Sequence, residues 1–118
     1  MKPFVFIFRQ GDRALSDEEL SRRTEEARAW ALSRLAKGQR LDPRIMTPEY
    51  CRVSAGEESR ELPLSADTPP TAMLFLEAAD AAEAVAMAKT HPGLRYGASI
   101  EVRAWISPLP PAGTATRT

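Results

Sequence analysis

DAAEAVAMAKTHPGLRYGASIEVRAWI, residues 80–106, holds the pattern that decides the fold of this chain. Asp80 and Glu83 suit the first turn of a helix, because a side chain at each position can satisfy free backbone N–H groups. Its packing face would consist of small apolar residues: Ala81, Ala84, Val85 and Ala88. Pro92 ends the helix, so we predict a turn at His91 and then a final strand.

The predicted final strand, residues 99–106, alternates between two sets of side chains. One set is apolar: Ile100, Val102, Ala104 and Ile106. The other set comprises Glu101, Arg103 and Trp105. Because neighbouring side chains of a strand point to opposite faces, we expect the apolar set to face a helix layer and the second set to face away from it.

Two other strands are predicted upstream, at residues 3–9 and 71–77. Their apolar residues are contiguous, from Phe4 to Phe8 and from Met73 to Leu76. Both faces of each strand are therefore apolar, which implies that both sides of the sheet are covered.

A long helix is predicted to begin after Ser16. Ser16 and Glu19 have the spacing of a capping box, and Gly38 can form the left-handed C-terminal cap. The predicted buried stripe follows spacings of three and four: Leu20, Thr24, Ala27, Ala31 and Leu35, with Trp30 at its edge.

The middle of the chain, residues 39–70, is interrupted by prolines: Pro43, Pro48, Pro63, Pro69 and Pro70. Two short runs, residues 50–54 and 61–64, predict a hairpin that turns near Gly56. After residue 106 the chain is rich in proline and threonine, so we expect a disordered tail at residues 107–118.

The order of elements predicts an α+β fold of the ferredoxin-like β-α-β-β-α-β type, with an antiparallel sheet, over residues 1–106. The helices of such a fold cover one face of the sheet. Since the strands are apolar on both faces, we expect a second copy of the chain to cover the other face, which would give a homodimeric α/β barrel.

Composition limits the classes of partner. The chain has 118 residues, the size of one domain, and its 16 basic and 16 acidic residues cancel. This balance disfavours nucleic-acid and membrane partners. The single cysteine, Cys51, excludes an internal disulfide and is expected to be at least half-buried. The apolar run before Arg9 is too short for a signal peptide, so we expect a cytoplasmic protein.

The C-terminal block, a helix followed by His91, Pro92 and GASIEVRAW, resembles that of the YCII-related proteins, the DGPF-domain family. Members of that family end in a Gly-x-Ile-Glu-Val-Arg-Pro type strand. The resemblance implies a dimeric α/β barrel of the ferredoxin-like type. The chain departs from the family at three places: it has Ala104 in place of the proline, LPLSADTPP in place of the Asp-Gly-Pro-Phe motif, and no histidine in the first long helix.

His91 is the only histidine, and a histidine can act as a general acid or base near neutral pH. Its place at a helix exit is also an ordinary capping position, where an imidazolium interacts well with the helix dipole. The sequence offers no ligand spacing for a metal and no phosphate-binding glycine loop, so we predict no metal and no cofactor.

Glu101, Arg103 and Trp105 would face the interior of the predicted dimer. Buried charges need partners, which could be each other, Arg9 of the first strand, or a bound ligand. Ion pairs that merely hold the strands in register would produce the same residues. Arg95 and Tyr96 could line the same cavity or belong to a plain loop.

Two main hypotheses of function follow. The first is a homodimer that binds a small polar or carboxylated molecule between its sheets through Arg9, Glu101, Arg103 and Trp105. The alternative is a cofactor-independent isomerase or lyase acting on a small organic acid or lactone, in which His91 moves the proton and Arg103 holds a carboxylate. A third hypothesis, an accessory protein that binds a partner through its proline-rich tail, uses only residues after Ile106.

Overall fold

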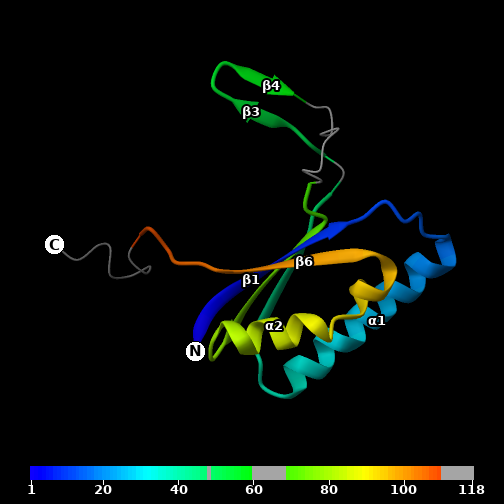
Figure 1. Cartoon of the computed structure of the whole chain (residues 1–118), viewed down its shortest axis with the longest axis vertical. Coiled ribbons are helices and arrows are strands. Elements are labelled where there is room, and N and C mark those ends of the chain that lie inside the picture. The colour runs from blue at the N-terminus through cyan, green and yellow to red at the C-terminus, as the bar shows by residue number, and fades with distance from the viewer. Residues whose placement is uncertain (48, 60–68, 110–118) are drawn as a thin grey trace.

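The computed structural model describes residues 1–47, 49–59 and 69–109, which form an α+β domain (Figure 1). A four-stranded antiparallel sheet has the strand order β2-β5-β1-β6 and is packed against two α-helices. Its strands are β1 (Lys2–Gln10), β2 (Leu41–Ile45), β5 (Ala72–Ala78) and β6 (Ala98–Ala104). The helices are α1 (Asp17–Ala36) and α2 (Ala81–Lys89), followed by the 3₁₀ turn η1 (Pro92–Tyr96). This arrangement is consistent with the predicted ferredoxin-like plan.

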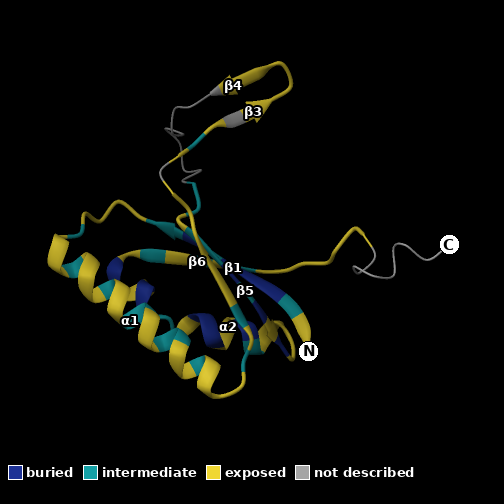
Figure 2. Cartoon of the chain, turned by 180° about the vertical axis from the view of Figure 1, so that it is seen from behind, coloured by how far each residue is buried: buried dark blue, intermediate teal, exposed yellow. Residues whose placement is uncertain are grey.

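The hydrophobic core lies between the sheet and the helices (Figure 2). Its buried members alternate along the two central strands and recur on one face of α2: Phe4, Phe6, Phe8, Leu74, Leu76, Ala78, Ala84, Met87 and Ala88. Phe6, at the centre, is fully buried, with 0% of its surface exposed. The alternation explains the contiguous apolar run of β1, because Phe4, Phe6 and Phe8 point to the helices while Val5 and Ile7 point away.

The start and end of α1 are as predicted, but its buried face is not. Ser16 and Glu19 form the capping box, and Gly38 lies in the left-handed region with a φ of 86° after the last turn. Leu20, Thr24 and Leu35 are exposed, so the predicted stripe is wrong at these three positions. The half-buried positions of α1 are instead Glu19, Arg23, Glu26, Ala27, Trp30, Ala31 and Arg34.

Polar contacts explain this rotation of α1. The Tyr96 hydroxyl of η1 and the Arg95 guanidinium both donate to the carboxylate of Glu26. Arg23 donates to the side-chain oxygen of Gln10, whose amide in turn donates to the Tyr96 carbonyl at 2.7 Å. Thus α1 turns charged side chains toward the β1 and η1 connections and leaves its leucines in water.

β2 is a strand that the sequence did not predict. It contains Pro43, a residue type that predicts an interruption, and it pairs with β5 at the edge of the sheet, with Pro43 opposite Leu74. A proline is tolerated there because an edge strand leaves half of its N–H groups outside the ladder.

The predicted hairpin exists, with corrected boundaries. β3 (Arg52–Ser54) and β4 (Glu57–Ser59) form a separate two-stranded sheet that turns at Gly56 and projects from the main sheet (Figure 1). The predicted second strand, residues 61–64, lies outside the described residues, as does most of the predicted tail. Cys51 beside β3 is exposed, so the prediction of a buried or half-buried thiol was wrong. In the described part of the chain, neither α-helix is long and apolar enough to cross a membrane.

Candidate functional site

The face of the sheet opposite the helices is the candidate site, and we call it the open face. Directly opposed residues of neighbouring strands share a face, so the register assigns its members. They are Pro3, Val5, Ile7 and Arg9 of β1, Met73, Phe75 and Glu77 of β5, Asp42 and Arg44 of β2, Glu101 and Arg103 of β6, and Trp105 just after it. The prediction that Glu101, Arg103 and Trp105 point away from the helices agrees with this register.

Charged residues at the β6 side of the open face pair with one another. A guanidinium nitrogen of Arg9 lies 2.7 Å from one oxygen of Glu101, and a nitrogen of Arg103 lies 3.3 Å from the other. One carboxylate thus lies between two guanidinium groups. All three side chains are partly exposed, from 32% for Arg9 to 65% for Arg103, so an anion can reach the cluster.

Apolar and aromatic side chains occupy the centre of the open face. Val5 is buried beneath its neighbours, with 6% of its surface exposed, whereas Ile7, Met73 and Phe75 are only half-buried. Trp105 lies edge-on to Phe75, with ring centroids 6.0 Å apart, and 41% of its surface is exposed. Exposed apolar groups of this size gathered on one surface usually mark an interface.

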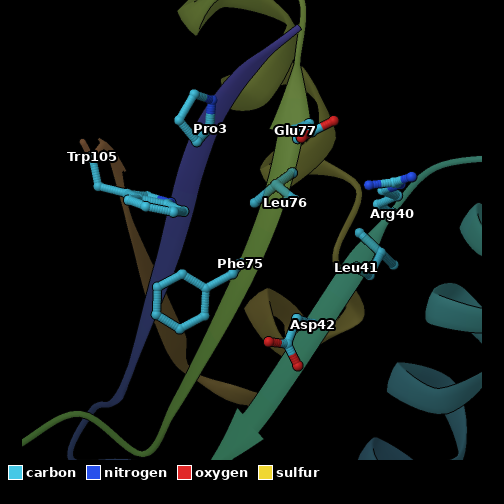
Figure 3. A pocket seen from close by; sticks show the side chains of 8 residues that line it. All are labelled: Pro3, Arg40, Leu41, Asp42, Phe75, Leu76, Glu77 and Trp105. Atoms are coloured by element: carbon cyan, nitrogen blue, oxygen red, sulfur yellow. The ribbon is translucent and has the colours of Figure 1, made fainter. Parts of the chain in front are cut away.

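A shallow hollow of about 410 Å³ opens at one end of this face (Figure 3). Its apolar wall is built by Pro3, Phe75 and Trp105, and its charged wall carries Arg40, Asp42 and Glu77. Leu41 and Leu76 also line it. The indole N–H of Trp105 is engaged, because it donates to the carbonyl of Phe4 at 3.2 Å. Trp105 therefore offers the hollow its ring surface rather than a donor.

The four residues predicted for the site lie on one side of the open face, and other residues of the site were not predicted. Arg9, Glu101, Arg103 and Trp105 lie together on the open face, and of these only Trp105 lines the hollow. Arg40 and Asp42 were not predicted as site residues, because Pro43 argues against a strand at β2. The alternation of Met73, Phe75 and Glu77 was visible in the sequence and would have placed them on the same face.

His91 lies on the opposite, helix side of the sheet. Its ring centroid is 4.8 Å from those of Phe8 and of Trp30, between the core and α1. The Nδ1 atom accepts a hydrogen bond from the Gly93 N–H at 3.0 Å, so His91 caps the start of η1. Burial lowers the pKa of His91 from 6.5 to about 4. His91 therefore caps the start of η1 as a neutral imidazole. The expected role, an imidazolium that interacts with the dipole at the end of α2, is wrong.

The sheet itself separates His91 from the charged cluster. Phe8, which contacts His91, points to the helices, whereas Glu101 is opposite Ile7 and points the other way. The isomerase or lyase hypothesis requires His91 and Arg103 in one pocket, and the described residues do not bring them together. Arg95 and Tyr96 bind Glu26 of α1 rather than lining the hollow.

A metal site also lacks support in the part of the chain that the structure describes, where no group of three or more histidine, cysteine or carboxylate residues could hold an ion. The sequence matches no protein-family model, and no curated protein is significantly similar to it.

Proposed function

We propose that this protein is a homodimer that packs its two open faces together, as a dimeric α/β barrel of the YCII-related type, and binds a small polar or carboxylated molecule between them. The observation that carries the proposal is the apolar centre of the open face, Val5, Ile7, Met73 and Phe75, which no helix covers in the described residues. A second sheet would remove this area from water, which is the main favourable term in association.

The balance of charge supports a second copy as the partner. The chain carries a formal net charge of 0, so two copies approach without overall repulsion. Residues of both signs of charge surround the apolar centre. When two identical faces pack together, each charged residue can therefore lie opposite a residue of the other sign on the second copy.

The ligand part of the proposal rests on two features of the same face. The hollow beside Trp105 combines aromatic walls with charged residues, the usual composition of a small-molecule site. In the cluster of Arg9, Glu101 and Arg103, the Arg103 side chain is 65% exposed, and arginine is well suited to a carboxylate because its planar fork matches the two oxygens.

Light scattering coupled to size exclusion tests the dimer. We expect the wild-type chain to be dimeric at micromolar concentration and Met73→Glu, which places a charge at the apolar centre, to be monomeric and folded. Leu32→Glu is the matched control, because Leu32 is exposed on α1 and its substitution leaves the dimer intact. A wild-type chain that is monomeric throughout this range contradicts the proposal.

The ligand is tested separately by titrating acetate, lactate and benzoate into the dimer and following Trp105 fluorescence in a Trp30→Phe background. We expect at least one of these carboxylates to change the emission, and Arg103→Gln to weaken its binding at a protein concentration at which light scattering shows that variant to be dimeric. An unchanged emission with all three removes the support for a carboxylate ligand and leaves the dimer proposal standing.

A further inference from the structure

The register of the sheet arranges the open face in rows. One row runs Asp42, Phe75, Val5 and Arg103 across the four strands. The next row runs Arg44, Met73, Ile7 and Glu101. Each of these two rows therefore has an apolar centre and charged ends.

The signs of these charges follow a rule. In the first row Asp42 is negative and Arg103 is positive; in the second row Arg44 is positive and Glu101 is negative. The two ends of a row thus carry opposite charges, and the order reverses from one row to the next. Within one chain, the two charged residues on each edge strand already form an ion pair. A guanidinium nitrogen of Arg44 lies 2.8 Å from a carboxylate oxygen of Asp42 on β2, and one of Arg103 lies 3.3 Å from a carboxylate oxygen of Glu101 on β6.

This pattern has a consequence for a symmetric pair of open faces. A two-fold axis that runs parallel to the strands and between β1 and β5 lays each row over the same row of the other copy, with its ends exchanged. The β2 edge then lies over the β6 edge of the second copy. Aligned sheets pack about 10 Å apart, a gap that long side chains from both edges can bridge.

We propose, building on the homodimer proposed above, that two copies pair about this axis, so that Asp42 meets the partner's Arg103 and Arg44 meets the partner's Glu101. At the apolar centre the large ring of Phe75 lies over the small side chain of the partner's Val5. Such an alternation of large and small side chains allows the two faces to interlock.

The parallel axis has an advantage over an axis perpendicular to the strands. With the parallel axis, symmetry alone superposes each row on its own copy, so the charges match without any adjustment along the strands. A perpendicular axis lays β2 over β2, and only one position of the axis, midway between the two rows, avoids like charges. Like charges in direct opposition are costly, which favours the parallel arrangement.

The hollow provides a second argument for the same axis. Arg40 and Trp105 both line it, at its two sides, just beyond the paired residues of β2 and β6. The parallel axis brings the partner's Trp105 over Arg40, an arrangement that a guanidinium and an indole ring favour. It also closes the hollow of each copy with the hollow of the other, so the binding space between the sheets belongs to both subunits.

Charge reversal tests this arrangement through mixed dimers. Asp42→Arg alone and Arg103→Asp alone each place two pairs of like charges at the interface, and we expect each dimer to dissociate at least about tenfold more readily than wild type. Mixing the two variants restores an opposite pair at both edges, so the mixed dimer should form in preference to either parent. Native mass spectrometry of chains that differ by a tag measures the three species directly.

The outcomes separate the arrangement from the dimer itself. A wild-type dimer whose two variants show no preference for each other overturns the parallel axis, because the perpendicular arrangement would set the introduced arginine against the partner's Arg44. A monomeric wild type overturns the proposed function instead. Glu18→Arg is the control: it breaks an exposed ion pair with Arg22 on α1 and should leave dissociation unchanged.

Discussion

A nitrogen of the Arg9 guanidinium on β1 lies 2.7 Å from a carboxylate oxygen of Glu101 on β6. The pair joins two neighbouring strands on the open face. Arg103 contacts the same carboxylate, so Glu101 is the residue on which the whole cluster depends.

Glu101→Gln should therefore have different effects on the single chain and on the dimer. In the monomeric Met73→Glu background, urea denaturation should show a loss of less than about 1 kcal/mol in the free energy of unfolding, because the ion pairs are solvent-exposed. In the otherwise wild-type chain the dimer should weaken more, since the two arginines lose their shared counter-charge at the interface. Equal small effects in both backgrounds would place Glu101 outside the interface.

His91 should make the stability of the protein fall in mildly acidic solution. Its folded pKa, about 4, lies below its unfolded value of 6.5, so between these values the unfolded chain binds the proton and the folded chain does not. Stability should be unaffected by His91 above about pH 6.5 and should decline by about 2 kcal/mol toward pH 4, after allowance for its partial exposure.

The comparison variant for this prediction is His91→Asn, which can still accept from the Gly93 N–H but does not titrate. Thermal denaturation over the same pH range should give a flatter profile for His91→Asn, together with lower stability near neutral pH from the lost contacts with Phe8 and Trp30. Parallel profiles for the two proteins would mean that folding does not lower the pKa of His91.

Tyr96 should ionise late. Its hydroxyl donates to the Glu26 carboxylate, and this hydrogen bond raises the pKa of Tyr96 while it lowers the pKa of Glu26. In a Tyr50→Phe background, ultraviolet titration should place Tyr96 above the ordinary value of about 10, and Glu26→Gln should bring it down. Identical titrations with and without Glu26 would show that the contact is absent in solution.

Gly97 should tolerate alanine less well than Gly38. Both have a positive φ, of 90° and 86°, and either substitution should cost about 1 kcal/mol from backbone strain. A Cβ at Gly97 would also lie 3.1 Å from the side-chain Nε2 of Gln10 and 3.3 Å from the Cβ of Arg13, whereas one at Gly38 would meet nothing within 4 Å. Chemical denaturation should therefore show a larger loss for Gly97→Ala, and a loss equal to that of Gly38→Ala would rule out the steric contribution.

Local patterns were sufficient to predict much of the fold. The alternation of residues 99–106, the capping box at Ser16 and the contiguous apolar runs predicted three strands and the first helix, and the structure has all four. These signals depend on near neighbours in the chain. They also predicted an apolar face of the sheet that the helices do not cover, because β1 carries apolar side chains on both of its faces.

Features that depend on distant residues were missed. Pro43 looks like an interruption until β2 is known to be an edge strand, which is a property of the whole sheet. Leu20 and Leu35 looked buried because Glu26 has no visible reason to face inward until Tyr96, 70 residues later, is placed beside it. The same limit hid the charged wall of the hollow.

The projecting hairpin offers a practical advantage. The sheet needs only that the ends of the segment between β2 and β5 meet, as they do where the Met46 N–H donates to the Thr71 carbonyl at 3.0 Å. The entropic cost of closing such a segment grows slowly with its length, so extra residues inserted at Gly56 should lower the free energy of unfolding of the domain only slightly. Since Cys51 is exposed on the same segment and is the only cysteine, it provides an attachment point for a fluorophore or spin label outside the hydrophobic core.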